Sequence, residues 1–298
     1  MTKSKITVWG APGSGKTTFL AALNVAMARS ELDWAFVAKN EESGIWLTTM
    51  TDQLVNREFP QPTTAVEELQ YLLIGPPRTR RKGLFRRTAI TEQTRVDLSL
   101  IDMPGGTFGG RSSRSTEVLN SSDGLLFLFD PIRESASGDS FDYFHGVITD
   151  LAHQAMASEP LGRLPHRLAV CITKFDDARV LSIAEQLGLV TTNPSDFYNR
   201  PSVDDARELF ARLCDVSASG NGGMLLRMID RFFQPQRVRF FATSTIGFHI
   251  RSGQTTFDWE DFQNVVPTED GDRIRGAVQP INVLEPILWL VDENVSRR

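Results

Sequence analysis

The sequence predicts an α/β protein built on a three-layer, doubly wound and mainly parallel sheet with helices on both faces. One observation behind this prediction is that short apolar runs alternate along the chain with longer segments of helical periodicity. A second is that the runs 124–130 and 167–173 are almost continuously apolar, which is typical of parallel strands covered on both faces. The third is a glycine-rich turn between the strand predicted for 5–9 and the helix that follows it.

The other elements follow from periodicity and turn residues. Residues 95–102 alternate between apolar and polar side chains and 66–74 is rich in strand formers, so we expect an antiparallel pair, and hence one antiparallel edge strand, at one side of the sheet. The basic stretch 78–87 between them then forms a hairpin tip that guards the sheet edge. A last strand is expected at 238–243. Loops are expected at 59–64 and 247–279, and helices at 41–55, 140–157, 203–213, 224–233 and 282–294, the last with Asn282 and Glu285 placed as a capping box.

The composition is that of an ordinary globular protein. Of the 298 residues, 41% are hydrophobic and 23% are charged, and the net charge of −5 gives no strong signal for nucleic-acid or membrane binding. Neither cysteine lies in a metal-ligand pattern, and Cys171 falls in an apolar run, as expected of a buried, reduced thiol. No signal peptide and no apolar run long enough for a transmembrane segment is recognisable, so we expect a cytoplasmic protein.

Residues 10–17, GAPGSGKT, carry the complete P-loop pattern G-x-x-x-x-G-K-[ST] between a strand and a helix. Glycines let the backbone wrap around a phosphate with its amides pointing inward, and the start of the helix adds the positive end of its dipole. Lys16 is expected to reach the β- and γ-phosphates and to act in catalysis, and the Thr17 hydroxyl to ligate Mg²⁺. The predicted phosphate-binding residues are Gly13, Ser14, Gly15, Lys16, Thr17 and Thr18.

Residues 102–105, DMPG, end the alternating strand. An acid at the end of a strand beside the P-loop strand can hold Mg²⁺, usually through a water, so Asp102 is a candidate metal ligand. The amide of Gly105 would then meet the γ-phosphate. The alternative interpretation is a strand-terminating aspartate in a Pro-Gly turn.

Residues 173–176, TKFD, follow another buried strand. With the two earlier motifs in this order, the sequence resembles the TRAFAC class of P-loop GTPases, which includes Ras-like proteins and translation factors and whose guanine-specificity motif is [NT]-K-x-D. The resemblance implies that Asp176 accepts hydrogen bonds from guanine N1 and N2, while the stem of Lys174 covers the base and Thr173 completes the motif. Adenine offers no such pair of donors and would leave the carboxylate unpaired. Taken alone, the tetrapeptide is also compatible with a common turn after a strand.

The resemblance implies further contacts. Residues 242–247 are similar to the T-S-A-K loop whose backbone reads the guanine oxygen; Ser244 matches this loop and Thr245 departs from it. Thr63 occupies the place of the switch threonine that closes on Mg²⁺ when GTP is bound, with Thr64 as the alternative ligand and an ordinary Pro-Thr loop as the simpler interpretation. The stretch 279–290 (QPINVLEPILWL) resembles the last helix of large bacterial, operon-encoded GTPases, including the double-GTPase families.

One position departs from the Ras-like pattern. Gly106 follows Gly105, where Ras-like enzymes place the glutamine that orients the attacking water. We therefore predict a GTPase that is slow without a protein partner, a homodimer or an arginine supplied from elsewhere. Candidates for that arginine, each more simply a solvated surface residue, are Arg78, Arg80, Arg81, Arg111 and Arg114.

The sequence thus predicts a single P-loop GTPase domain over 1–298, with loop and helical insertions near 76–90, 190–222 and 247–278 as partner-binding segments. It is expected to bind GTP or GDP with Mg²⁺ and to act as a molecular switch. One alternative is a P-loop nucleotide or small-molecule kinase, in which the basic stretch 78–87 would be an arginine-rich lid. The other is a non-hydrolysing scaffold that binds nucleotide for stability.

Overall fold

The computed structural model describes residues 3–60, 69–82, 88–100, 113–156, 163–190, 202–269 and 271–291. Its centre is a seven-stranded sheet in the order β2-β3-β4-β1-β5-β6-β7. These strands are β1 (Lys3–Gly10), β2 (Ala35–Ala38), β3 (Leu69–Lys82), β4 (Thr88–Leu100), β5 (Gly124–Phe129), β6 (Arg167–Ile172) and β7 (Val238–Ala242). Neighbouring strands run parallel except around β3, which is antiparallel to both β2 and β4.

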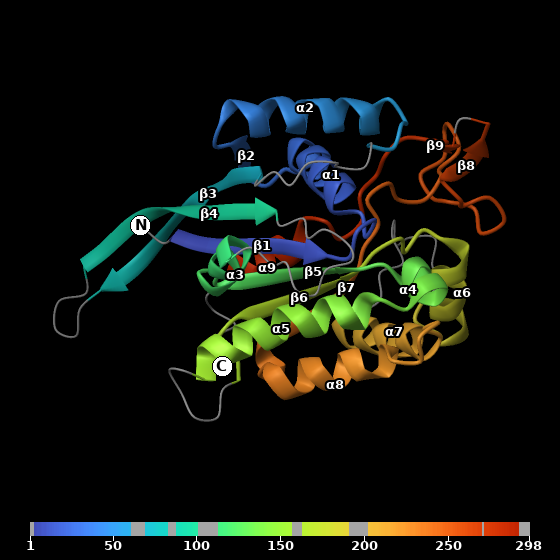
Figure 1. Cartoon of the computed structure of the whole chain (residues 1–298). Helices are drawn as coiled ribbons and strands as arrows, with labels where there is room; N and C mark the ends of the chain where they lie inside the picture. Colours follow the sequence, from blue (N-terminus) through green and yellow to red (C-terminus); the bar gives the residue numbers. More distant parts are fainter. Residues whose placement is uncertain are drawn as a thin grey trace.

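Helices cover both faces of this sheet. They are α1 (Lys16–Arg29), α2 (Glu41–Val55), α3 (Ser113–Asn120), α4 (Pro131–Ser137), α5 (Ser140–Met156), α6 (Ala178–Gln186), α7 (Val203–Asp215), α8 (Gly222–Phe232) and α9 (Glu285–Val291). In Figure 1, α1 and α2 lie above the sheet, and α5, α7 and α8 lie below it. The predicted three-layer, mainly parallel α/β fold is therefore confirmed.

The alternation of side chains along each strand divides the core into two layers. On β1, Val8 packs into the layer of α1 and α9, and the neighbouring Trp9 packs into the layer of α5. The Trp9 ring stacks on Phe144 of α5 with 5.4 Å between the ring centroids. On the other face, Trp289 of α9 packs in the same layer as Val8. Because full burial of one such side chain contributes about 1.5–3 kcal/mol, each layer stabilises the sheet that carries the loops described below.

The edge of the sheet differs from the prediction in one respect. The antiparallel pair β3–β4 exists, but β2 lies outside it and forms the sheet edge. This four-residue strand has an alternating pattern of exposure, with Val37 exposed and Phe36 packed against the core. All four residues are apolar, so the sequence contains no period-2 alternation, and a run this short is not separated from a loop by sequence alone.

The basic stretch also differs from the predicted hairpin tip. Residues 78–82 belong to strand β3 and pair with residues 88–92 of β4, so only 83–87 could form the tip, and these lie outside the described residues. Figure 1 shows this part of β3 and β4 projecting beyond the rest of the sheet as a two-stranded ribbon. The basic residues 78–82 thus extend the sheet rather than cap it.

Two predictions about the part of the chain after residue 246 need correction. The stretch 247–279, expected to be a loop, contains a hairpin of β8 (Val265–Thr268) and β9 (Gly271–Ile274) and an aromatic cluster in which Phe248 and Phe257 lie 4.4 Å apart. Helix α9 begins at Glu285 rather than at 282. Asn282 is not a helix cap, because its backbone is left-handed (φ 49°) and its side-chain amide donates to the carbonyl of Ala242 at 2.8 Å.

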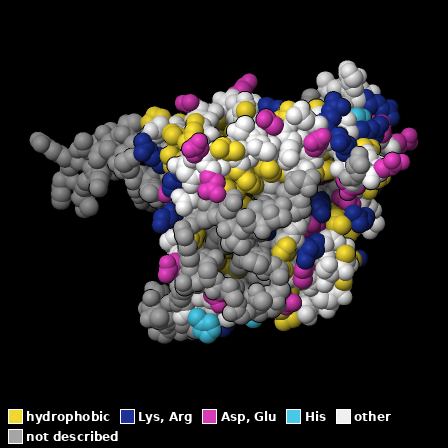
Figure 2. All heavy atoms as spheres, turned by 45° about the horizontal axis from the view of Figure 1, so that its top comes forward, with side chains coloured by type: hydrophobic (Ala, Val, Ile, Leu, Met, Phe, Trp, Pro, Cys, Tyr) yellow, Lys and Arg dark blue, Asp and Glu magenta, His cyan; other side chains and the backbone are white. Residues whose placement is uncertain are grey.

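Helix α2 begins and ends at the predicted residues. The Asn40 side chain caps its first turn by accepting a hydrogen bond from the Ser43 amide at 2.8 Å. Leu47 and Leu54 face the core, whereas Ile45 stays 62% exposed. Figure 2 shows apolar side chains among acidic ones over this part of the surface.

Candidate functional site

The loop between β1 and α1 has a backbone that its glycines make possible. Gly13 and Gly15 both have left-handed backbones, with φ of 75° and 91°. Gly10 is required for a different reason, because a Cβ there would lie 2.6 Å from the carbonyl oxygen of Leu128 and 2.7 Å from the Ser14 hydroxyl. The loop closes with a hydrogen bond from the Ser14 amide to the Ala11 carbonyl at 3.0 Å.

The predicted phosphate-binding side chains are held inside or beside this loop. The ammonium group of Lys16 donates to the carbonyl oxygens of Gly10 and Ala11, both at 3.0 Å, and Lys16 is only 5% exposed. The Ser14 hydroxyl is buried and has no hydrogen-bond partner among the described residues. Thr17 and Thr18 lie partly buried in the first turn of α1. A buried, unsatisfied hydroxyl is costly, and a nucleotide phosphate in the loop is a group that could accept its hydrogen bond.

The segments that follow β5, β6 and β7 lie at the same edge of the sheet as this loop. Because β1, β5, β6 and β7 are successive parallel neighbours, their carboxyl ends lie side by side. Thr173 continues from β6 and is tied to β5, since its amide and hydroxyl both donate to the carbonyl of Phe129 at 2.8 and 3.0 Å. Phe175 is tied to the end of β7 through its amide, which donates to the Thr243 carbonyl at 3.0 Å. The TKFD segment is therefore fixed between its two neighbouring strands.

Asp176 and Ser244, which were predicted from separate motifs, are in direct contact. The Ser244 hydroxyl donates a short hydrogen bond to the Asp176 carboxylate, and it also accepts a hydrogen bond from the Gly247 amide at 2.8 Å. Asp176 is 7% exposed and Ser244 1% exposed. Thr245 follows Ser244 and is partly buried. The structure thus brings the two predicted guanine-reading segments together at the carboxyl ends of β6 and β7.

Burial raises the pKa of Asp176 from its ordinary value of 3.8 to about 6, although the hydrogen bond from Ser244 acts in the opposite direction. A carboxylate that accepts hydrogen bonds from guanine must be ionised. Below pH 6 the bound base would have to displace a proton, so we expect the GDP dissociation constant to be flat above pH 7 and to rise about tenfold per pH unit below 6. Titration with fluorescent GDP between pH 5 and 8 measures this profile.

The control for that profile is the variant Ser244→Ala. It removes the hydrogen bond that lowers the pKa of Asp176, so the midpoint should move to higher pH. The pKa values of the nucleotide's own phosphates are not expected to change with this substitution, so a shifted midpoint would be assigned to Asp176. A dissociation constant that is the same at pH 5 and pH 7, in a protein that is folded at both, would contradict the prediction.

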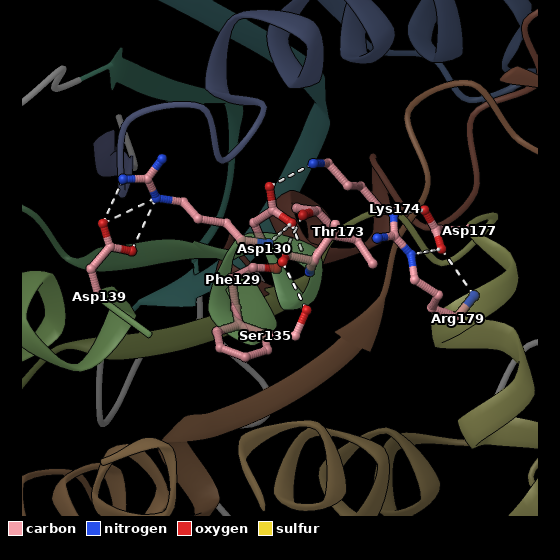
Figure 3. Close-up of polar contacts among 10 residues, drawn as sticks. Phe129, Asp130, Ser135, Asp139, Thr173, Lys174, Asp177 and Arg179 are labelled. Atoms are coloured by element: carbon pink, nitrogen blue, oxygen red, sulfur yellow. Dashed lines mark hydrogen bonds and ion pairs between the residues drawn. The ribbon is translucent and has the colours of Figure 1, made fainter. Parts of the chain in front are cut away.

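Asp130, which the sequence analysis did not assign to the site, connects the two halves of this edge. It follows β5 and is 2% exposed. One carboxylate oxygen accepts the amides of Ile132 and Arg133 at 3.0 and 3.1 Å and so caps α4, and the other forms an ion pair with Lys174 at 2.7 Å (Figure 3). Lys174 itself has a left-handed backbone, with φ of 58°. The signal in the sequence is the Asp-Pro pair directly after a buried strand, which is a helix start with proline in the first turn.

Arg133 is the second residue that the sequence analysis did not identify. Its guanidinium forms a two-pronged ion pair with Asp139, with the Nε nitrogen 3.0 Å from one carboxylate oxygen. The ion pair with Asp139 raises the pKa of this already basic group, so Arg133 stays charged. Its Nη1 atom lies 3.8 Å from the position that a Cβ would take on Gly13 of the phosphate loop. An arginine therefore stands at the rim of the loop.

Several predicted site residues lie outside the described part of the chain. Among the metal ligands and switch residues, these are Thr63, its alternative Thr64, Asp102 and Gly105. The described part of the chain contains no cluster of three or more metal-ligating His, Cys, Asp or Glu side chains. Of the predicted magnesium ligands, only Thr17 is described, and its place at the start of α1 is compatible with that role.

The fold and this arrangement of residues define a P-loop nucleotide-binding protein. A family model, Double-GTPase 2, matches residues 4–197, and the chain belongs to this family of P-loop GTPases. This confirms the resemblance to P-loop GTPases of the double-GTPase type that the sequence motifs indicated. Membership of this family implies that the ligand is a guanine nucleotide. A comparison with curated proteins found no match. Among the described helices, none combines the length and the apolar character that a membrane crossing requires.

Proposed function

We propose that this protein is a magnesium-dependent molecular switch that binds GTP and GDP across the carboxyl ends of β1, β5, β6 and β7 and hydrolyses GTP slowly on its own. The observation that carries the proposal is the arrangement of the site residues along this edge. Asp176 lies two residues after Lys174, Lys174 is paired with Asp130, and the first turn of α4 that Asp130 caps holds Arg133 near Gly13. One nucleotide lying along this edge would touch the base-reading and the phosphate-binding segments together.

The phosphates are proposed to lie in the loop 10–17. Backbone amides of the loop are proposed to donate to the phosphate oxygens, and Lys16 is proposed to exchange its two carbonyl contacts for contacts with these oxygens. Thr17, Thr63 and Asp102 are proposed to hold Mg²⁺, which neutralises charge on the β- and γ-phosphates when it is bound. The chain's own contribution is to fix the phosphates against the backbone amides of the loop.

The switch role rests on the segments around Thr63 and Gly105, which are proposed to close on the γ-phosphate. Because Gly106 replaces the water-orienting glutamine, hydrolysis is proposed to depend on a protein partner or a second copy of the chain. The free, buried thiols of Cys171 and Cys214 support a cytoplasmic location. We favour the switch over a nucleotide kinase, because the contact between Asp176 and Ser244 builds a buried acceptor suited to guanine.

The test is nucleotide binding and single-turnover hydrolysis by the purified full-length chain. We expect GDP and GTP to bind at least about 100-fold more tightly than ADP and ATP, because adenine would leave the buried carboxylate of Asp176 unpaired. Bound GTP should be hydrolysed at a rate on the order of 10⁻⁴ to 10⁻² per second, as in small GTPases without an activating partner.

Each alternative gives a different result in the same assays. Equal affinities for adenine and guanine nucleotides would contradict the assignment of guanine as the bound base. Hydrolysis at partner-stimulated speed by the chain alone would refute the dependence on a partner. Complete retention of GTP over many hours would favour the non-hydrolysing scaffold, and transfer of phosphate to a small acceptor would favour the kinase.

A further inference from the structure

Arg133 presents a positive charge to the phosphate loop from the first turn of α4. Its Nε and Nη2 atoms are engaged by Asp139, and its Nη1 atom has no hydrogen-bond partner among the described residues. That free nitrogen is the one that lies 3.8 Å from the Cβ position of Gly13. The side chain is 32% exposed, so solvent and ligands have access to part of it.

The position of Arg133 is fixed by contacts at both ends of the side chain. At its base, the Arg133 amide donates to the carboxylate of Asp130 at 3.1 Å, which fixes the first turn of α4. At its tip, Asp139 accepts hydrogen bonds from both Nε and Nη2, the two-pronged arrangement that suits a guanidinium. Little conformational entropy would be lost when a third group binds to the remaining nitrogen, because the side chain is already ordered.

The order of the strands decides which part of a nucleotide this arginine would meet. The DMPG segment, expected to meet the γ-phosphate, follows β4 on one side of β1. Arg133 follows β5 on the opposite side of β1, and the TKFD segment follows β6 one strand further along. Along this edge, the phosphate loop and the base-reading segment therefore flank Arg133. The α-phosphate and the ribose lie between the β-phosphate and the base of a nucleotide. Of these two groups only the α-phosphate is an anion that a guanidinium would pair with.

We propose that Arg133 binds the α-phosphate of the guanine nucleotide and sets the affinity for GDP and GTP alike, without taking part in the cleavage of the γ-phosphate. This inference rests on the proposed function, since it requires a guanine nucleotide along the same edge. Asp139 is then a positioning residue, which holds the guanidinium at the rim of the loop and shares it with the phosphate. An arginine contact of this kind adds a cation to the site that the P-loop pattern itself does not contain.

The experiment compares Arg133→Gln with the unaltered protein in competition titrations against fluorescent GDP, using GTP, GDP and guanosine as competitors. Loss of one charge-assisted contact should weaken GDP and GTP binding to a similar extent, by about 10- to 100-fold. Guanosine has no phosphate, so its affinity should change by less than about twofold. The single-turnover rate of bound GTP is measured for each variant in parallel.

The matched control is Arg207→Gln. Arg207 of α7 is also partly exposed and also forms an ion pair with one aspartate, Asp230, at 2.9 Å, but it lies in the helical layer. The substitution Arg207→Gln removes the same charge as Arg133→Gln and should leave the nucleotide affinity unchanged. Arg133→Lys keeps the charge and can still pair with Asp139, so an intermediate loss of GDP affinity is expected even if the glutamine variant is unstable.

Three outcomes would overturn the proposal. The first is an unchanged GDP affinity in both Arg133 variants, and the second is a loss of guanosine affinity as large as the loss of GDP affinity. The third is an unchanged affinity together with a slower GTP hydrolysis that depends on protein concentration. That result would mean that Arg133 acts on the nucleotide of a second copy of the chain. Failure of the proposed function is distinguishable from these, because the unaltered protein would then not prefer guanine nucleotides in the first titration.

Discussion

A chain that ends at residue 197, where the family match ends, is expected not to fold. Residues 202–291 supply β7 to the sheet, α7 and α8 to one face and α9 to the other. Their removal would expose β6 as a sheet edge and uncover both core layers. Each fully buried apolar side chain contributes about 1.5–3 kcal/mol to the free energy of unfolding. The loss of several such side chains therefore exceeds the typical free energy of unfolding of a domain, about 5–15 kcal/mol. Fully buried side chains lost in this way include Leu209, Phe210, Ile229, Phe233 and Ile287.

Circular dichroism and limited proteolysis of fragment 1–197 and of a longer control fragment measure this outcome. A fragment of residues 1–291 is the control, because it keeps every element that the structure describes and should unfold cooperatively. Fragment 1–197 should show no cooperative thermal transition and should be cleaved throughout. A cooperative transition in fragment 1–197 would show that the proposed single domain over 1–298 is two folding units.

The substitution Asp176→Asn is expected to exchange guanine specificity for xanthine specificity. The carboxylate is proposed to accept hydrogen bonds from N1 and N2 of guanine, and an amide can accept only one of these while its nitrogen faces the second donor. Affinity for GDP should fall by about 100-fold or more, because a buried donor then meets a donor. Xanthine carries a carbonyl where guanine carries the amino group, so xanthosine diphosphate should bind to the variant more tightly than GDP.

Competition titrations with GDP, xanthosine diphosphate and ADP test this exchange. The matched control is Asp177→Asn at the neighbouring position, where Asp177 caps α6 and pairs with Arg179 at the surface. Asparagine is also a good helix cap, so the control should remain folded and keep its guanine preference. If Asp176→Asn bound GDP as tightly as the unaltered chain, the base would have to lie elsewhere.

The sequence signals were sufficient where local pattern and tertiary structure agree. The strands β5 and β6 were predictable because their apolar runs are continuous, and α2 because its periodicity and its cap coincide. The short strand β2 and the late start of α9 were not, since the first depends on pairing with β3 and the second on the contact between Asn282 and Ala242. These contacts join residues that are far apart in the chain.

The same distinction applies to the site. The loop 10–17 carries a complete motif between a strand and a helix, and the TKFD segment was assigned by its order after that loop and the DMPG segment. Asp130 and Arg133 have no such motif, and their relevance appears only when β5 is placed between β1 and β6. The assignments of Thr63, Asp102 and Gly105 stay predictions, because they fall outside the described residues.

The central position of Asp130 has an energetic consequence. Its single carboxylate fixes Lys174 with one oxygen and the backbone of α4 with the other. A disturbance of Lys174 can therefore reach the first turn of α4, and the reverse, through this one side chain. If the nucleotide lies as proposed, we expect the free energies of binding the base and the phosphates to be coupled rather than additive. The binding free energies of separate base and phosphate fragments should then sum to less than that of the intact nucleotide.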